Sequence, residues 1–413
     1  MKSDRSQSAR HTLGGEGVRQ ALARRSSRRL LHIALLIETS REYGRGLLRG
    51  VARYHQKHGP WSVYFEPHGL NEPPPAWLKT WRGDGILARV DDWKTADMIL
   101  ETGLPAVDVR GALPEHPLPF VGIENHAVAQ LGFEHLQQLG LQHFAFCGTP
   151  RGENPNQDIR CDAFVETVEA TGRHCHVFLG GNCRNGAASW ETIQKEIARW
   201  LQKLPKPIGI MTCHDDRGHQ TLDACRRVGL HVPNDIAVVG VDNDTSVCGL
   251  CTPPLSSIDV NPGRVGYEAA ALLMRLIEGE PAPRTPVYIG PPRGIVSRKS
   301  TDVFAINDDD VVAVLRFIHE NACHGIQVSD AIKMVKNSPS TLERRVKAAI
   351  GRTIKAEIDR IRLQRAKLLL QMTQLPIATV AARSGFSVPK YFCDVFRKFE
   401  GMTATAYRSL FCE

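Results

Sequence analysis

Short apolar runs alternate with longer amphipathic stretches from residue 30 to about residue 300. The run 30–37 is almost entirely apolar, as expected of a strand that is buried on both faces of a parallel sheet. The segment 46–57 that follows places Leu47, Val51 and Tyr54 at helical spacing. By the same criteria we expect strands at 61–65, 85–88, 105–109, 120–123, 143–147, 175–179, 208–212 and 236–241, and helices at 126–139, 159–171, 190–203, 218–228 and 263–278. This alternation predicts parallel α/β sheets covered by helices.

The α/β region is too long for one ordinary doubly wound domain. Over 30–302 it predicts a two-lobed α/β domain with a cleft between the lobes. The segment 287–310 contains Pro291-Pro292 and ends on three aspartates, and it predicts one last strand followed by a linker at 303–310. Across 311–413 every periodic segment is helical, so an all-α domain is expected there.

The clearest local pattern lies near the C-terminus, at residues 376–386. Ile377, Val380 and Ala381 share one helix face, and Gly385 permits a tight turn before a second helix at 388–399. This spacing is typical of a helix-turn-helix unit, whose second helix enters the major groove of DNA. On that second helix and just before it, the residues predicted to face DNA are Ser387, Lys390, Asp394 and Arg397.

A fainter copy of the same pattern lies upstream. Helices are expected at 328–335 and 341–348, and the second of them turns Leu342 and Val346 inward. Its outward residues, predicted to face DNA, are Ser340, Arg344 and Lys347. A long helix at 354–370 joins the two copies, so the pair could enter successive major-groove segments roughly 34 Å apart.

Charge is distributed unevenly along the chain. Residues 311–413 hold 17 basic and 8 acidic residues, a net of +9, and residues 1–29 carry a net of +6. The α/β region between them has a net of −7. A basic helical domain behind an acidic body indicates a protein that places one end on the phosphates of double-stranded DNA. Residues 1–29, rich in Arg, Ser and Gly, are predicted to be a basic disordered tail.

The remaining composition narrows the class of protein. No apolar stretch is long enough for a membrane span or a secretory signal, so we expect no membrane association. Eleven scattered cysteines favour reduced thiols in the cytoplasm. Cys248 and Cys251 form a lone pair without a second pair at zinc spacing, and no phosphate-binding or hydrolase motif is present. We therefore expect no metal, no cofactor and no catalytic residues.

The helical domain resembles the AraC/XylS family of transcription regulators. The family's connecting-helix pattern appears as Arg362-Leu363, Ala366 and Leu368-Leu369, and its closing pattern as Thr405-Ala406-Tyr407-Arg408. The second unit carries its Ile-x-x-Val-Ala-x-x-x-Gly-Phe pattern at 377–386. The first unit departs from the family at Ile332, Lys336 and Asn337. The resemblance implies two DNA-binding helix-turn-helix units.

The α/β region is similar to the sugar-binding domain of LacI/GalR regulators and periplasmic sugar receptors. Shared stretches are Gly83-Asp84-Gly85-Ile86, 239–243, 265–270 and 291–302. The N-terminal DNA-binding helices usual in LacI proteins are absent from this sequence. The resemblance implies a cleft that binds a sugar, with a pentose such as xylose as the first candidate effector.

Candidate sugar ligands follow the carboxyl ends of the predicted strands, where ligands bind in open α/β sheets. Asp242 and Arg160 match ligand positions of the resembling family, and Asp215 stands at another. The weaker candidates are Glu124, Asn125, Arg89, Asp91 and Tyr43. Helix capping is an alternative role for Asp215 and Glu124. Asn156 replaces a tryptophan found in regulators of this layout, which bears on the identity of the sugar.

Three hypotheses follow. The first is a sugar-responsive transcription regulator, expected to be an activator of carbohydrate-utilisation genes. It would work as a homodimer, with RNA polymerase as a further partner, and cleft closure would control the placement of its helix-turn-helix domains. The second is a ligand-independent DNA-binding dimer. The third is an α/β enzyme that acts on a sugar and carries a helical appendage.

Overall fold

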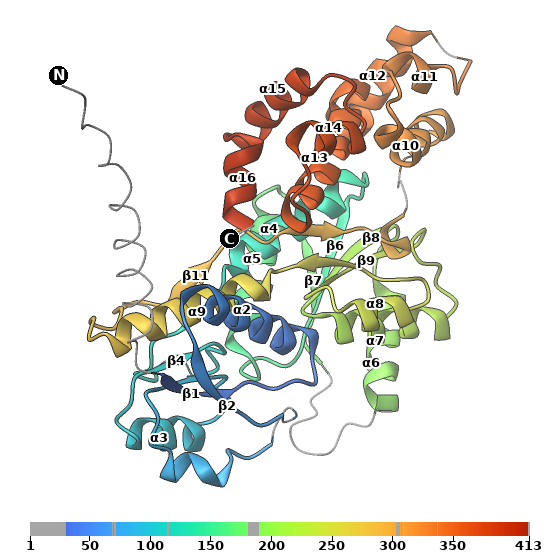
Figure 1. Ribbon diagram of the computed structural model, residues 1–413. Helices are drawn as coiled ribbons and strands as arrows, with labels where there is room; N and C mark the ends of the chain where they lie inside the picture. The colour runs from blue at the N-terminus through green and yellow to red at the C-terminus, as the bar shows by residue number, and fades with distance from the viewer. Residues whose placement is uncertain are drawn as a thin grey trace, which may run out of the picture.

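The N-terminal lobe is built on a parallel sheet. The computed structural model describes residues 30–411 apart from 68, 70–71, 114, 181–189, 303–305, 307 and 337, so the tail predicted at 1–29 lies outside the described residues. The sheet has the order β2-β1-β3-β4. The elements of this lobe are β1 (Leu31–Leu36), α2 (Glu42–His58), β2 (Trp61–Phe65), η1 (Ala76–Thr80), β3 (Gly85–Ala88), α3 (Trp93–Glu101), β4 (Ala106–Asp108), β5 (Val121–Ile123), α9 (Pro262–Ile277) and β11 (Val287–Ile289). Strands β5 and β11 form a separate two-stranded sheet. Helices α2 and α9 pack side by side (Figure 1).

The C-terminal lobe holds six strands in the order β12-β10-β9-β8-β6-β7. All neighbours are parallel except the pair β10 and β12. The elements are α4 (Asn125–Gln138), β6 (His143–Cys147), α5 (Pro155–Glu169), β7 (Cys175–Phe178), α6 (Trp190–Lys203), β8 (Ile208–Thr212), α7 (Asp215–Arg227), β9 (Ile236–Val241), α8 (Thr245–Leu250), β10 (Ser256–Asp259) and β12 (Gly294–Val296), with a short helix η2 (Lys299–Thr301) after them. Residues of β8 and β9 are buried throughout, which explains their continuous apolar sequence.

The chain crosses between the lobes three times. It passes from β5 into α4, from β10 into α9, and from β11 into β12. Strand β11 pairs with β5 in one lobe, whereas β12 pairs with β10 in the other. The single last strand expected in 287–310 is therefore wrong, because Pro291 and Pro292 separate two short strands that serve different sheets. Helices α3 and α8 were also not predicted.

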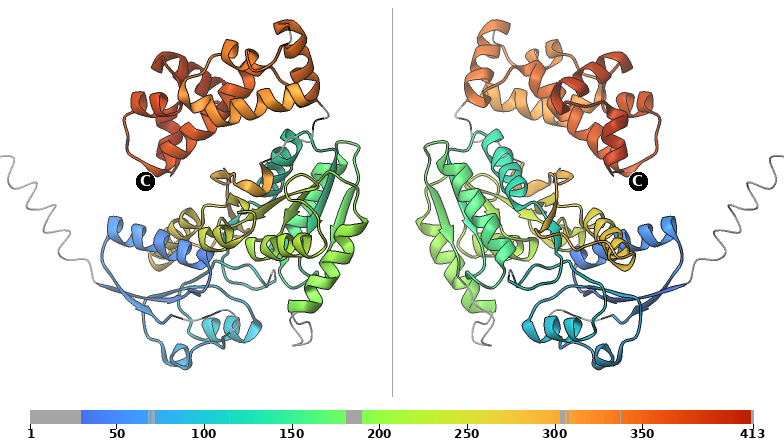
Figure 2. Two further views of the ribbon diagram at one scale, coloured as in Figure 1. Left: turned by 90° about the vertical axis from the view of Figure 1, so that its right-hand side faces the viewer. Right: turned by 90° about the vertical axis from the view of Figure 1, so that its left-hand side faces the viewer.

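The C-terminal domain is entirely helical in its described part. Its elements are α10 (Asp309–Asn321), η3 (Ala322–His324), α11 (Val328–Ile332), α12 (Pro339–Ile350), α13 (Ile354–Met372), α14 (Ile377–Arg383), α15 (Pro389–Glu400) and α16 (Ala404–Phe411). Helix α13 contributes Ile354 and Ile358 to one apolar core and Leu363 and Leu370 to a second. Each core holds one helix-turn-helix unit, and the long helix joins them. Figure 2 shows this row of helices lying across one side of the sensor.

Two of the boundaries that differ from those expected lie at the start of the helical domain. Helix α10 begins at Asp309, inside the segment predicted to be a linker, because the Asp308 side chain accepts a hydrogen bond from Val311 N and caps the helix. Helix α11 ends at Ile332, three residues earlier than expected, and turns follow it.

Candidate functional site

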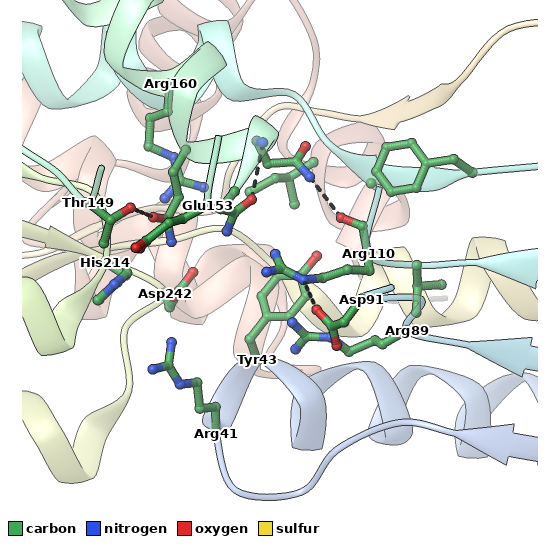
Figure 3. A pocket seen from close by; sticks show the side chains of 17 residues that line it. Arg41, Tyr43, Arg89, Asp91, Arg110, Thr149, Glu153, Arg160, His214 and Asp242 are labelled. Atoms are coloured by element: carbon green, nitrogen blue, oxygen red, sulfur yellow. Dashed lines mark hydrogen bonds and ion pairs between the residues drawn. The ribbon is translucent and has the colours of Figure 1, made fainter. Parts of the chain in front are cut away.

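A cavity of about 640 Å³ lies between the two lobes of the sensor. Its volume is in the range of small-molecule sites. Figure 3 shows polar side chains from both lobes directed into it. The lining residues are Arg41, Tyr43, Arg89, Asp91, Val109, Arg110, Phe120, Gly122, Ile123, Thr149, Glu153, Asn154, Asn156, Gln157, Arg160, His214 and Asp242. Five of the eight predicted ligand residues are among them, namely Asp242, Arg160, Arg89, Asp91 and Tyr43.

Asp242 lines the cavity at the carboxyl end of β9. Its backbone has φ 102°, a region that side chains other than glycine rarely adopt, and Asn243 follows with φ 52°. Hydrogen bonds from Asp242 N to Ile258 O (3.0 Å) and from Asn243 N to Ser257 Oγ (3.0 Å) fix this turn. Strained backbone that is held by its surroundings is common at ligand sites. Burial raises the pKa of the Asp242 carboxyl to about 6, while the nearby Arg160 guanidinium opposes that shift.

Arg160 extends from α5 and is 4% exposed. Its Nε donates to Asn125 Oδ1 at 3.1 Å, and its Nη1 donates to the carbonyl of Cys213. Burial lowers the pKa of the guanidinium, and Asp242 is the first of the groups that counteract this effect. The buried cation Arg160 and the partly buried carboxylate Asp242 both line the cavity and form a pair of opposite hydrogen-bonding character. Such a pair can hold the vicinal hydroxyls of a sugar, since a hydroxyl both donates and accepts.

The N-terminal lobe supplies the opposite wall. Arg89 Nη1 donates to the buried Glu38 Oε1 at 2.7 Å, whereas its Nε has no hydrogen-bond partner within the part of the chain that the structure describes. Arg110 Nε donates to Asp91 Oδ1 at 2.7 Å. Tyr43 lies beneath Arg89, with the guanidinium carbon 5.7 Å from its ring centre, and burial raises the pKa of its hydroxyl to about 12. This wall therefore offers both donors and an aromatic face.

The remaining three predicted ligands are not among the residues that line the cavity. Asp215 accepts hydrogen bonds from Ser257 Oγ (2.6 Å) and Asp244 N (2.7 Å), and these bonds occupy its carboxylate behind the cavity wall. Glu124 caps α4 by accepting from His126 N at 2.9 Å, the alternative role that the sequence had left open. Asn125 supports the site indirectly, because it holds Arg160.

Several lining residues were not predicted. Arg41, Arg110 and His214 stand at or just beyond the carboxyl ends of β1, β4 and β8. His214 caps α7 through its Nδ1, which accepts from Arg217 N at 3.1 Å, and burial holds its pKa well below the usual range. The rule that ligands bind at the carboxyl ends of parallel strands could have found Arg110 and His214, which closely follow β4 and β8.

Direct bonds join the lobes across the cleft. Arg41 Nη2 lies 2.8 Å from Asp216 Oδ2, and Asn156 Nδ2 donates to Arg110 O at 2.8 Å. In addition, Glu42 N donates to Asp244 Oδ2 at 3.3 Å. These bonds thus bridge the two lobes in this structure, while the cavity between them stays partly open to solvent.

The second site is the exposed face of the helical domain. All seven residues predicted to face DNA are exposed, on α12 and on α15 with the turn before it. The inward residues Leu342, Val346, Phe392 and Phe396 are buried in the two cores. Gly385, with φ +85°, makes the turn of the second unit, and a Cβ there would lie 2.5 Å from Ala322 O. The packing thus leaves a polar, partly basic face on each second helix.

The described residues meet neither the requirements of a metal site nor those of a membrane-spanning helix. Within the described ranges, no cluster of three or more His, Cys, Asp or Glu side chains is placed to hold a metal ion. None of the helices described there is long and apolar enough to cross a membrane.

A two-lobed sensor with a polar cavity, followed by a double helix-turn-helix domain, defines a transcription regulator and not an enzyme. The comparisons with known proteins agree. Residues 133–301 match the periplasmic binding protein-like domain, residues 332–409 a helix-turn-helix domain, and residues 32–125 the XylR N-terminal domain. The chain belongs to the family of xylose operon regulatory proteins, with an AraC-type DNA-binding domain.

Relatives match over almost the whole chain. The chain is 32% identical over 382 residues to the xylose operon regulatory protein of Haemophilus influenzae, which covers 91% of this chain and 97% of the relative. It is 30% identical over 383 residues to the protein of the same name from Escherichia coli, covering 92% and 97%. A solved structure described as the xylose-binding transcription activator xylR shares 30% identity with a TM-score of 0.60, covering 93% of this chain and 99% of that one.

Proposed function

We propose that this protein is a cytoplasmic, sugar-responsive transcription activator of carbohydrate-utilisation genes. It would act as a dimer whose cleft closes on a sugar and thereby changes how its helix-turn-helix units are placed on DNA. The observation that carries the proposal is the polar cavity between the lobes, where Asp242 and Arg160 face Tyr43 and Arg89. The names of the relatives make xylose the first effector to test.

The test joins both sites in one measurement. DNA that binds the full-length protein is selected from a random-sequence pool, and its affinity is measured by fluorescence anisotropy with and without each sugar of a panel. The proposed function predicts that at least one sugar changes the DNA affinity. The expected change is about 5- to 150-fold, the usual size of coupling between two binding sites. No change with any sugar that binds would contradict it and favour the ligand-independent dimer.

Arg397 should contribute directly to DNA binding. It is exposed on α15, on the same face as Lys390 and Asp394. We expect Arg397→Ala to weaken DNA binding by about 1–3 kcal/mol, or roughly 5- to 150-fold. Arg316→Ala is the matched control, because Arg316 is exposed on α10, outside both units. Equal DNA affinity of the two variants would contradict a contact between Arg397 of α15 and DNA.

A direct contact joins the sensor to the DNA-binding domain. Gln371, buried near the end of α13, donates from Nε2 to the Arg293 carbonyl at 3.1 Å and to Tyr407 Oη at 2.8 Å. Arg293 lies in the third crossover between the lobes, and its N donates to Asp259 O at 2.8 Å, beside the second crossover. Rotation of the lobes would move the Arg293 carbonyl. We propose that this contact transmits closure of the cleft to α13.

Gln371→Ala tests that route. One hydrogen bond made in a single state contributes about 1 kcal/mol, so we expect the sugar-induced change in DNA affinity to shrink roughly fivefold. Because the bond is made in only one state of the cleft, its loss should also change the sugar affinity of the full-length protein, by no more than about fivefold. Gln374→Ala is the control, because Gln374 is exposed just after the same helix and does not line the crevice between the sensor and α13. An unchanged coupling in Gln371→Ala would exclude this contact as the route.

A further inference from the structure

Glu38 is a buried carboxylate behind the wall of the cavity. It follows the end of β1 by two residues, its side chain is 3% exposed, and it is not among the residues that line the cavity. A charge in such surroundings is costly unless both of its oxygens have hydrogen-bond partners. The partners of Glu38 therefore indicate what this carboxylate does.

The two oxygens of Glu38 have different partners. Oε1 accepts a hydrogen bond from Arg89 Nη1 at 2.7 Å. Oε2 accepts from Arg41 N at 3.0 Å and from Ser40 Oγ at 2.8 Å. One carboxylate thus joins Arg89, directly after β3, to the loop that leads into α2.

The first turn of α2 passes close to Glu38. A Cβ at Gly44 would lie 2.7 Å from Glu38 Oε1 and 2.1 Å from the Glu38 carbonyl oxygen, so a larger residue there would displace the carboxylate. In addition, Arg45 Nη1 donates to two carbonyls of the loop before the helix, at 2.8 and 3.0 Å. The loop is therefore held closely, and the position of the Arg41 backbone depends on Glu38.

Both arginines that depend on Glu38 reach the cavity (Figure 3). The bond to Glu38 occupies Nη1 of Arg89, whereas the buried Nε has no hydrogen-bond partner among the residues that the structure describes and can donate to a ligand. Arg41 bridges the lobes, with its Nη2 2.8 Å from Asp216 Oδ2. Glu38 thus contacts one residue of the cavity wall and one residue of the bridge between the lobes.

From these contacts we infer that Glu38 is a positioning residue that couples occupation of the cavity to bridging of the lobes. It orients Arg89 so that Nε donates to a sugar hydroxyl, and it fixes the Arg41 backbone where the side chain reaches Asp216. A sugar that holds Arg89 therefore favours the bridge, and because coupling is reciprocal, the bridge favours binding of the sugar. This inference rests on the proposed function, since it assumes that the cavity binds a sugar.

A double-mutant cycle on the full-length protein tests the coupling. Calorimetric titration with D-xylose, L-arabinose, D-ribose, D-glucose and D-galactose first identifies the sugar that binds the unmodified protein most tightly. Glu38→Gln keeps the size of the side chain but removes its charge, and it should weaken binding of that sugar about tenfold. Asp216→Asn removes the charge at the far side of the bridge and should weaken binding about threefold. Because both changes break the same link, the double variant should lose about tenfold and not the roughly 30-fold of independent effects.

Two further variants separate positioning from stability. Asp84→Asn is the matched control, because Asp84 is a partly buried carboxylate at the opposite end of the same sheet, accepts from His32 N at 2.8 Å and does not line the cavity. It should keep the sugar affinity of the unmodified protein. Ser40→Ala is a milder change that leaves the charge of Glu38 and removes one bond to Oε2, and it should weaken sugar binding about threefold even if Glu38→Gln does not fold. Circular-dichroism melting shows which variants are folded.

The outcomes separate the inference from the proposed function. If Glu38→Gln and Ser40→Ala bind the sugar within about twofold of the unmodified protein, the inference is overturned while sugar sensing stands. Additive losses in the double variant would also overturn it, because Glu38 would then act on Arg89 alone. An equal loss in Asp84→Asn would assign the effect to general stability, against the inference. If none of the five sugars binds the unmodified protein or alters its DNA affinity, both the inference and the proposed function fail.

Discussion

Asp242→Asn should weaken sugar binding by about 100-fold. The substitution keeps the shape of the side chain but removes the charge, and a hydrogen bond to a charged group contributes about 1.5–3 kcal/mol. It also leaves the buried Arg160 without the carboxylate that offsets its charge. The measurement is calorimetric titration of the full-length protein with the sugar that changes its DNA affinity. DNA affinity in the absence of sugar should be unchanged, because Asp242 is in the sensor.

Glu124→Gln provides the matched control for Asp242→Asn. Glu124 is an acidic residue at the first crossover that caps α4 and does not line the cavity. Sugar affinity should therefore be retained in this variant, with a modest loss of stability. Retention of full sugar affinity in Asp242→Asn would show that the sugar binds elsewhere.

The same carboxylate predicts a pH dependence. Burial raises the pKa of Asp242 to about 6, so the group is ionised at neutral pH and takes up a proton as the pH falls through 6. Sugar affinity should decline over that range in the unmodified protein. The decline should be absent in Asp242→Asn. Calorimetric titrations with the sugar at pH 7.5 and pH 5 distinguish the unmodified protein from this variant.

Glu357→Gln should destabilise the DNA-binding domain by about 3 kcal/mol. The carboxylate is 1% exposed on α13 and accepts hydrogen bonds from three basic side chains: Arg360 Nη2 at 2.7 Å, His319 Nε2 at 3.0 Å, and Arg352 Nε. Removing the charge leaves these groups clustered without a counter-ion. Tryptophan occurs only in 61–200, whereas the domain of Glu357 is helical, so fluorescence follows the sensor and circular dichroism at 222 nm includes the domain. The expected result is an earlier urea transition by circular dichroism with an unchanged fluorescence transition.

The pH dependence of this cluster has a definite sign. Burial opposes ionisation of Glu357, but the hydrogen bonds from Arg360 and His319 outweigh it and hold the pKa well below the usual range. A group whose pKa is lowered on folding stabilises the fold above its unfolded pKa, about 4.3, and this contribution is lost as the pH falls below that value. The difference in unfolding free energy between Glu357→Gln and the original protein should therefore become smaller at acidic pH. Glu320→Gln, an exposed carboxylate on α10, should change neither transition.

The sequence predicted best those elements whose burial is uniform. The strands 85–88, 208–212 and 236–241 begin and end where expected, since a strand buried on both faces is apolar at nearly every position. The short strands β11 and β12 were not predicted as two separate strands, because they are only partly buried and too short to show a hydrophobic pattern. Helix α8, of six residues, is likewise shorter than the window in which helical periodicity can be recognised.

The prediction of site residues was likewise successful for some positions and not for others. Asp242 and Arg160 lie in the cavity as the strand-end rule and the family resemblance implied, although their contact with sugar stays a prediction. Asp215 also follows a strand, yet its carboxylate is turned to Ser257 and Asp244. Sequence position locates the loop but not the direction of the side chain, because that direction depends on partners distant in the chain. Arg41 was missed for a similar reason: its role across the cleft depends on Asp216, from the other lobe.

The three crossovers have a consequence for how the protein is made. Strand β5 pairs with β11, and α2 packs against α9; both partners are encoded after β10, when all of the C-terminal lobe except β12 and η2 has been made. During synthesis five of the six strands of the C-terminal lobe can thus be in place while the first lobe still lacks a helix and a strand. The DNA-binding domain emerges last, from a ribosome that has already delivered every residue of the sensor cavity. A nascent chain that can grip DNA therefore already carries the sensor that regulates it.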